Sequence, residues 1–169
     1  QEKIKKVGQQ GVLCLLSDCL RSENPGFTPP EVKIKDMFES EIANCPGKFV
    51  VTTMSSNISR WKLAIDVSLA HKRKIVLVGR TIEKNMALAQ KLKYLEYPED
   101  IFVKRNKMQQ YADNELTFLV AGSQAQIGSS LDKIAAGDVP NLEIKTNDKV
   151  IFSTDYIPGN ESAIYRLID

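Results

Sequence analysis

Polar side chains follow each of five short apolar segments of this chain, and their types suit the binding of phosphate. Asp18 follows the first segment, and hydroxyl and amide side chains follow the second and the fourth. A Gly-Arg-Thr turn follows the third. Such groups, together with the N-termini of helices, bind phosphate or sugar–phosphate groups. We therefore predict contacts with a phosphate-bearing ligand from the following residues: Ser55, Ser56, Asn57, Arg60, Arg80, Ser123 and Gln124.

Each of these residues also has a purely structural alternative. Serine, threonine and asparagine are the usual N-caps of helices, and Gly-Ser is a common turn. Neither VGRTIEKN nor AGSQAQIGSS has the glycine spacing of a Rossmann fingerprint or a P-loop. The single histidine, His71, leaves no plausible Ser-His-Asp set, and this chain alone cannot build a hydrolytic zinc site from histidine. We therefore predict no metal ligand within the chain.

The apolar segments themselves are predicted strands. They are rich in Val, Ile, Leu and Phe and lack the alternation of a half-buried strand, so both of their faces should be buried. Cys14, in the first of them, is expected to be a buried apolar side chain. The predicted strands cover residues 11–16, 48–53, 74–78, 116–121 and 149–153.

Amphipathic stretches between the strands are predicted helices. Thr28-Pro29-Pro30-Glu31 resembles a capping box with prolines in the first turn, and it opens a helix that runs to about residue 43. A helix over residues 129–136 is closed by Gly137. Short helical pieces are expected over residues 100–111, and a last helix starts at about residue 158.

Two further predicted helices carry apolar residues at helical spacing along one side. The first covers residues 57–70 and the second covers residues 81–94. Their stripes consist of Ile58, Trp61, Ile65 and Ser68 in the first helix, and Ile82, Met86, Ala89 and Leu92 in the second.

The alternation of strands and helices predicts an α/β fold. We expect a three-layer α/β/α arrangement with a mostly parallel sheet, because parallel strands need crossover helices that cover both faces. Residues 1–169 are predicted to form a single domain. In such sheets ligands bind beyond the carboxyl ends of the strands, which is where the candidate residues lie.

The composition fits one globular domain with a core, since 43% of the 169 residues are hydrophobic. The net charge of +2 does not by itself indicate nucleic acid, and we interpret the basic clusters at residues 3–6, 72–74 and 104–107 as solvated faces or helix ends. No apolar run is long enough to span a bilayer, and no signal peptide is found. Three cysteines without metal spacing favour a reduced, cytoplasmic protein. The first residue is Gln1 and not Met, which favours an internal piece of a longer protein.

Four phrases of the sequence, in order and near the expected spacing, resemble the β-CASP region of the bacterial ribonuclease J family. This family belongs to the metallo-β-lactamase nucleases. The resemblance covers residues 11–161. The phrases are LLSDCLRSENPGFTPPE, VVTTMSSNISRWKLAIDVSLAHKRKIVLVGRTIEKNMALAQKLKYL, AGSQAQIGSSLDKIAAG and KTNDKVIFSTDYIPGNE.

The resemblance implies a nuclease that cuts RNA endonucleolytically and also digests it from 5′ to 3′. In the family the β-CASP domain is inserted into a metallo-β-lactamase domain that holds two zinc ions, and RNA lies in a channel between the two domains. Asp18 matches the acidic residue of the first β-CASP motif, which orients the active site without binding metal. The zinc-binding cluster and the later histidine motifs would lie outside this chain, so the chain alone is expected to hold no zinc and to be inactive.

Two departures from the family pattern leave a second function open. The family usually has a histidine where this chain has Ser59, and it reads Gly-Glu-Pro where this chain has Ala125, Gln126 and Ile127. The alternative is a non-catalytic partner subunit of a ribonuclease J-type complex, and a homo- or hetero-oligomer is expected. A third, weaker interpretation is an unrelated α/β domain that binds a nucleotide.

Overall fold

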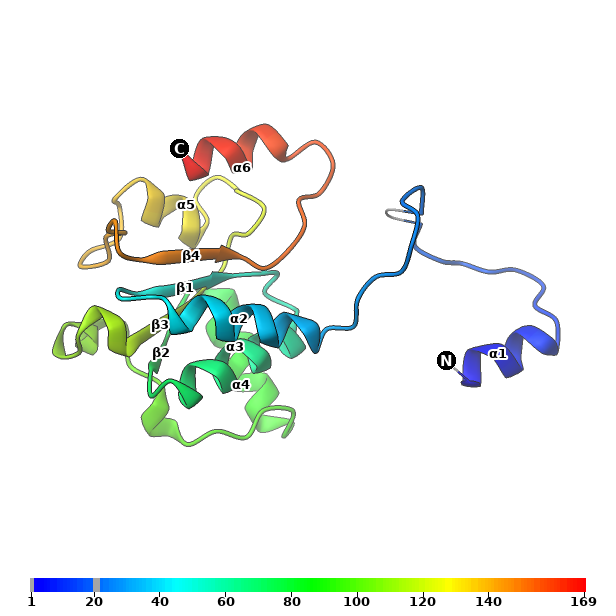
Figure 1. Ribbon diagram of the computed structural model, residues 1–169, viewed down its shortest axis with the longest axis horizontal. Coiled ribbons are helices and arrows are strands. Elements are labelled where there is room, and N and C mark those ends of the chain that lie inside the picture. The colour runs from blue at the N-terminus through cyan, green and yellow to red at the C-terminus, as the bar shows by residue number, and fades with distance from the viewer. Residues whose placement is uncertain (1, 20–21) are drawn as a thin grey trace.

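A four-stranded sheet, all of whose strands are parallel, forms the centre of the protein in the computed structural model, which describes residues 2–19 and 22–169 (Figure 1). The strand order is β2-β3-β1-β4. The predicted parallel sheet is thus confirmed. The strands are β1 (Phe49–Thr52), β2 (Lys74–Val78), β3 (Leu116–Val120) and β4 (Lys149–Phe152).

Helices cover both faces of the sheet, which confirms the predicted three-layer fold. The first face carries α2 (Lys33–Ala43), α3 (Ile58–Ala70) and α4 (Arg80–Lys91). The second face carries α5 (Ser130–Ala135) and α6 (Glu161–Ile168). Three short 3-10 helices join α4 to β3 at Glu99–Ile101, Arg105–Gln110 and Asp113–Glu115. Most helices lie within about three residues of their predicted bounds.

Two hydrophobic clusters, one on each face, account for the apolar strands. Phe49 and Val51 of β1 point into the cluster under α2 and α3, whereas Val50 between them points into the opposite cluster. Successive side chains of a strand alternate between faces, so a strand that is buried on both faces must be apolar throughout. Four of the five predicted strands are thus confirmed as apolar strands that are covered on both faces.

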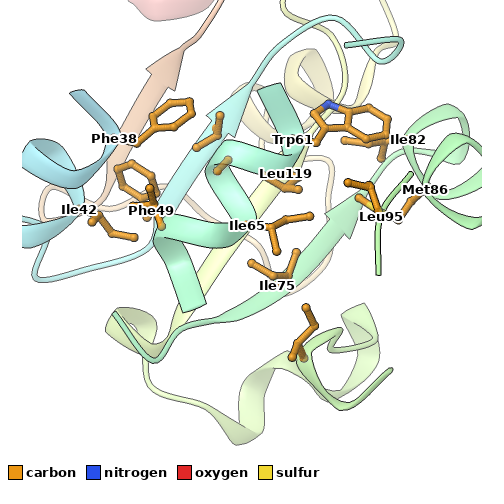
Figure 2. Packing of buried hydrophobic residues seen from close by; sticks show 14 of the residues in the cluster. Phe38, Ile42, Phe49, Trp61, Ile65, Ile75, Ile82, Met86, Leu95 and Leu119 are labelled. Carbon is orange, nitrogen blue, oxygen red and sulfur yellow. The ribbon is translucent and has the colours of Figure 1, made fainter. Parts of the chain in front are cut away.

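The first cluster is packed between the sheet and helices α2, α3 and α4 (Figure 2). Trp61 and Ile65 of α3 belong to this cluster and are fully buried, as their spacing predicts. Ile82 and Met86 of α4 are buried as well, and only Leu92 of the two predicted stripes is largely exposed, because α4 ends at Lys91. Burial of a large aliphatic side chain stabilises a fold by about 1.5–3 kcal/mol.

The predicted strand at residues 11–16 does not form, and this prediction is wrong. A helix that the sequence analysis missed, α1 (Glu2–Gln9), is followed by an extended segment that lies apart from the sheet (Figure 1). Leu13 is 105% exposed and Leu16 is 93% exposed, and Cys14 is exposed too. The apolar composition favours a strand, but a strand also needs a partner backbone, and in the described part of the chain this segment pairs with none of the four strands.

The capping box predicted at Thr28 is also wrong. Helix α2 begins at Lys33 after Val32, which provides no side-chain cap. The Glu31 carboxylate instead binds the Arg60 guanidinium, which donates from Nε and Nη2 at 2.8 and 3.0 Å. Nη1 of Arg60 donates to the carbonyl and hydroxyl oxygens of Ser153 at 2.6 and 2.8 Å. Arg60 thus ties the segment that precedes α2 to the end of β4.

A buried lysine fastens the opposite, amino end of the sheet. Lys48 is only 5% exposed, and its Nζ donates to Asp148 Oδ2 at 2.9 Å and to the Glu143 carbonyl at 3.1 Å. Asp148 also accepts from the backbone N–H groups of Lys48 and Lys145 at 2.7 and 2.9 Å. The residues that precede β1 and β4 are thereby held together.

We expect Lys48→Met to lower the free energy of unfolding by about 3 kcal/mol, because it leaves the carboxylate of Asp148 buried without its cation. Lys149→Met is the matched control. Lys149 pairs with Glu41 at 2.8 Å, but both side chains are partly exposed, so its loss should cost less than about 1 kcal/mol. Urea unfolding at pH 7 measures both values, and equal losses would contradict a special role for Lys48.

We further expect acid to release the contact between Glu31 and Arg60. The hydrogen bond from Arg60 lowers the pKa of Glu31 below its ordinary value of 4.5. A carboxyl with a lowered pKa stabilises the folded state above pH 4.5, and this contribution is lost as the pH falls through the lowered pKa. Side-chain NMR of Glu31 should therefore give a midpoint below 4.5 that rises toward 4.5 in Arg60→Gln; identical midpoints would rule the contact out.

Candidate functional site

The carboxyl ends of the strands meet at one edge of the sheet, as the sequence predicts. Threonines at the end of β1 join it to both neighbours. Thr52 Oγ1 donates to the Val120 carbonyl of β3 at 3.1 Å, and Thr53 Oγ1 donates to the Ser153 carbonyl after β4 at 3.0 Å. The loops after these three strands therefore start side by side.

Gln124 holds the loop after β3 to the loop after β4. This side chain is 5% exposed, and its Nε2 donates to the Asp155 carbonyl at 2.8 Å. Its Oε1 accepts from the Ile157 N–H at 2.8 Å and from the Asn160 amide at 3.4 Å. The neighbouring Ser123 is buried as well. These contacts give Gln124 a structural role, and ligand binding by Ser123 and Gln124 stays a prediction.

Asn57 and Arg60 also make contacts within the protein. Asn57 Oδ1 accepts from the Arg60 N–H at 3.0 Å and so caps α3. The guanidinium of Arg60 is engaged by Glu31 and Ser153, as described above. The capping alternative is therefore the one that the geometry supports for Asn57, and ligand contacts by these two residues remain predictions.

Ser55 and Arg80 lie at a cavity of about 820 Å³ beyond the ends of β2 and β3. Ser56 is exposed and does not line it. The cavity is formed by the first turn of α4, the loops after β1, β2 and β3, the 3-10 helix Arg105–Gln110 and α5. Its lining consists of Ser55, Val78, Gly79, Arg80, Thr81, Glu83, Arg105, Asn106, Ala121, Gly122, Gln126, Gly128, Ser129, Ser130, Lys133 and Val139.

Two glycines allow the loops around this cavity to approach each other closely. Gly79 and Gly122 adopt φ angles of +133° and +115°, a conformation that favours glycine. A Cβ atom at Gly122 would lie 2.7 Å from Ser129 Cβ, and one at Gly79 would lie 2.8 Å from Ser130 Oγ. The hydroxyls of Ser129 and Ser130 are thereby placed on the cavity wall.

The charge of the cavity is positive. Arg80, Arg105 and Lys133 line it from three different elements, and Glu83 is the one carboxylate among the lining residues. Of these three cations, only Arg80 is predicted from the sequence. Arg105 belongs to the basic cluster at residues 104–107, which was interpreted as a solvated face, and no pattern in the sequence joins Lys133 to it. The arrangement as a whole suits an anionic ligand.

Asp18 lies away from these residues. It is exposed in the extended segment and borders a surface cavity whose described lining residues all fall between residues 18 and 29. The role of Asp18 at an active site therefore stays a prediction.

The part of the chain that the structure describes brings together no group of three or more His, Cys, Asp or Glu side chains that could hold a metal ion. The single histidine, His71, contacts Glu39 through Nε2 at 2.8 Å. None of the helices formed by residues 2–19 and 22–169 is long and apolar enough to cross a membrane.

Comparison with known proteins shows the family. The family model described as "Ribonuclease J, beta-CASP domain" matches residues 46–169, so Asp18 lies outside the matched region. Ribonuclease J of Helicobacter pylori (strain ATCC 700392 / 26695) is 35% identical over 99% of this chain and 24% of its own length. Ribonuclease J of Synechocystis sp. is 33% identical over 99% of this chain and 26% of its own length. Ribonuclease J2 of Bacillus subtilis is 30% identical over 99% of this chain and 30% of its own length.

This chain spans between 24% and 30% of the length of these three relatives. The match to the family model begins in the loop between α2 and β1, extends through α6 and includes the entire parallel sheet. The interpretation as an unrelated nucleotide-binding domain is therefore excluded. The chain belongs to the ribonuclease J family, and its parallel sheet with the surrounding helices is a β-CASP domain.

Proposed function

We propose that this chain is part of a cytoplasmic ribonuclease that acts in RNA processing and decay, and that its β-CASP domain contacts the RNA. The observation that carries this proposal is the match of residues 46–169 to the β-CASP domain of ribonuclease J. The positive cavity at the carboxyl edge of the sheet supports it, because phosphate groups contribute much of the affinity of proteins for nucleic acids.

Hydrolysis of RNA would depend on residues outside this chain. The described residues do not fit a metal site, so the two zinc ions that the family resemblance implies would be held elsewhere in the complete protein. Endonucleolytic and 5′-to-3′ activities belong to the same proposal. Asp18 is proposed to help orient that site, and the loops of the β-CASP domain are proposed to guide the RNA toward it.

A non-catalytic partner subunit in a homo- or hetero-oligomer is the second candidate, and one observation favours it. Gln126, which stands where the family usually has a carboxylate, lines the cavity. Its neutral amide makes the cavity more positive than a glutamate would. Ser59, at the position of the usual histidine, is exposed. These departures change how RNA would be held and leave the sheet intact.

We expect the complete gene product to cleave a 5′-monophosphorylated RNA in the presence of zinc, whereas the 169-residue chain under the same conditions should not. The reason is that the described residues offer no metal cluster. Gel analysis of end-labelled RNA, with a chelator as control, measures both. Metal-dependent cleavage by the 169-residue chain would refute the assignment of the zinc site to other residues. An inactive complete protein that nevertheless binds RNA would favour the partner subunit.

A further inference from the structure

We propose that Arg60 is a positioning residue for the reaction, because it holds the segment that carries Asp18 in a fixed place against the carboxyl edge of the sheet. This inference rests on the proposed function, in which Asp18 acts at the active site. It assigns Arg60 a task that differs from the RNA contact predicted from the sequence. Arg60 acts on catalysis through the position of Asp18 and does not touch the RNA.

The guanidinium of Arg60 makes four contacts within the protein. Nε and Nη2 donate to the two carboxylate oxygens of Glu31 at 2.8 and 3.0 Å, and such a forked pair fixes the direction as well as the distance of the contact. Nη1 donates to the carbonyl and hydroxyl oxygens of Ser153 at 2.6 and 2.8 Å. The side chain of Arg60 is only 14% exposed. Little of the guanidinium is therefore left for a phosphate group.

Glu31 lies at the point where the chain leaves the layered domain. It precedes α2, and the extended segment leads away from the start of this helix toward α1 (Figure 1). Helix α2 itself is held by Phe38 and Ile42, which are buried in the first cluster. Residues 22–30, in contrast, are all exposed. Loss of the contact with Arg60 would leave the start of α2 as a hinge for this segment.

The chain between Glu31 and Asp18 is stiffened by prolines, so an anchor at Glu31 also acts on Asp18. Pro29 and Pro30 directly precede Glu31. A proline ring fixes its own φ angle and restricts the residue before it. Asp18 and Pro29 border the same surface cavity, so the chain folds back between them. A rotation at Glu31 would therefore displace Asp18.

Ser153 connects the anchor to the centre of the sheet. Its N–H donates to the Thr52 carbonyl at 2.8 Å, and its own carbonyl accepts from Thr53 Oγ1 at 3.0 Å. The same carbonyl accepts from Nη1 of Arg60. One guanidinium thus ties the segment that carries Asp18 to the ends of β1 and β4.

Catalysis depends on such an anchor more strongly than RNA binding does. A displacement of about 1 Å at an active site can lower the rate about 100-fold. The affinity for RNA, in contrast, comes from many phosphate contacts along the strand. A looser anchor should therefore lower kcat and leave the affinity for RNA nearly unchanged.

The test uses the complete gene product and three single variants. Arg60→Gln and Glu31→Gln each remove the contact, but they change the net charge in opposite directions. Lys62→Gln is the matched control for the charge of Arg60→Gln, because Lys62 lies on the same helix and its partner at 2.8 Å, Asp66, belongs to that helix too. Cleavage of a 5′-monophosphorylated RNA gives kcat and KM. Fluorescence anisotropy with the same RNA, in the presence of a chelator, gives Kd.

We expect Arg60→Gln and Glu31→Gln each to lower kcat about tenfold, as a displacement of less than 1 Å would. KM and Kd should change less than about twofold in both, although their charge changes are opposite. The double variant should be no slower than the slower single variant, because both substitutions remove one shared contact. Lys62→Gln should keep kcat within about twofold of the wild type.

Three outcomes would overturn the assignment of Arg60 while the proposed function stands. The first is weaker RNA binding in Arg60→Gln with normal kcat in Glu31→Gln, which would assign Arg60 to the RNA. The second is normal kcat in both variants, and the third is an equal loss of kcat in Lys62→Gln. A wild-type protein that does not cleave RNA would instead contradict the proposed function, and the assignment of Arg60 with it.

Circular dichroism and thermal unfolding check that each variant is folded at the temperature of the assay. Glu31→Gln carries the test by itself if Arg60→Gln does not fold, because the side chain of Glu31 is 45% exposed and is not part of either hydrophobic cluster. A folded Glu31→Gln protein with wild-type kcat would overturn the inference, and a tenfold loss of kcat with unchanged Kd would support it.

Discussion

The pairing of β1 with neighbours on both sides fixes the geometry on which the candidate site depends. Thr52 of β1 lies opposite Val120 of β3 and Phe152 of β4, so the three strands end at the same level. A shift of one residue would exchange the side chains of a strand between the two faces of the sheet. Because both faces are covered by hydrophobic clusters, the two cores hold this register, and the register in turn places the loops after β1, β3 and β4 side by side.

Much of the fold can be predicted from the sequence because a continuous apolar segment is what a strand buried on both faces requires. β2 matches its predicted bounds, and the other three strands differ only at their ends. Residues 11–16 have the same composition and yet remain exposed. Residues 11–16 differ from the four strands in having no partner backbone in the described part of the chain. Composition does not specify a partner, so it cannot reveal this difference.

The candidate site was predictable in its location but less so in its residues. Polar side chains after parallel strands must gather at one edge, and they do. Arg60 and Gln124, however, are occupied by Glu31, Ser153 and the loop after β4. Arg105 and Lys133 reach the cavity from segments that are far from Arg80 in the sequence. Their convergence depends on how α5 and the 3-10 helix pack on the second face of the sheet, which no local pattern expresses.

The polar residues at this edge of the sheet are of two kinds: those that bind other parts of the protein and the cations that line the cavity. A buried polar group must be hydrogen-bonded, since leaving it unsatisfied costs about 1–3 kcal/mol. This requirement explains why Gln124, which is buried, binds its neighbours, and it applies in part to Arg60, which is partly buried. The cavity cations are exposed, so water solvates them and no internal partner is needed. Long exposed side chains lose conformational entropy when a ligand orders them, so each contact adds little affinity. We therefore expect this edge of the sheet to hold its loops firmly, and any polyanion that it binds to be held weakly and with a strong dependence on salt.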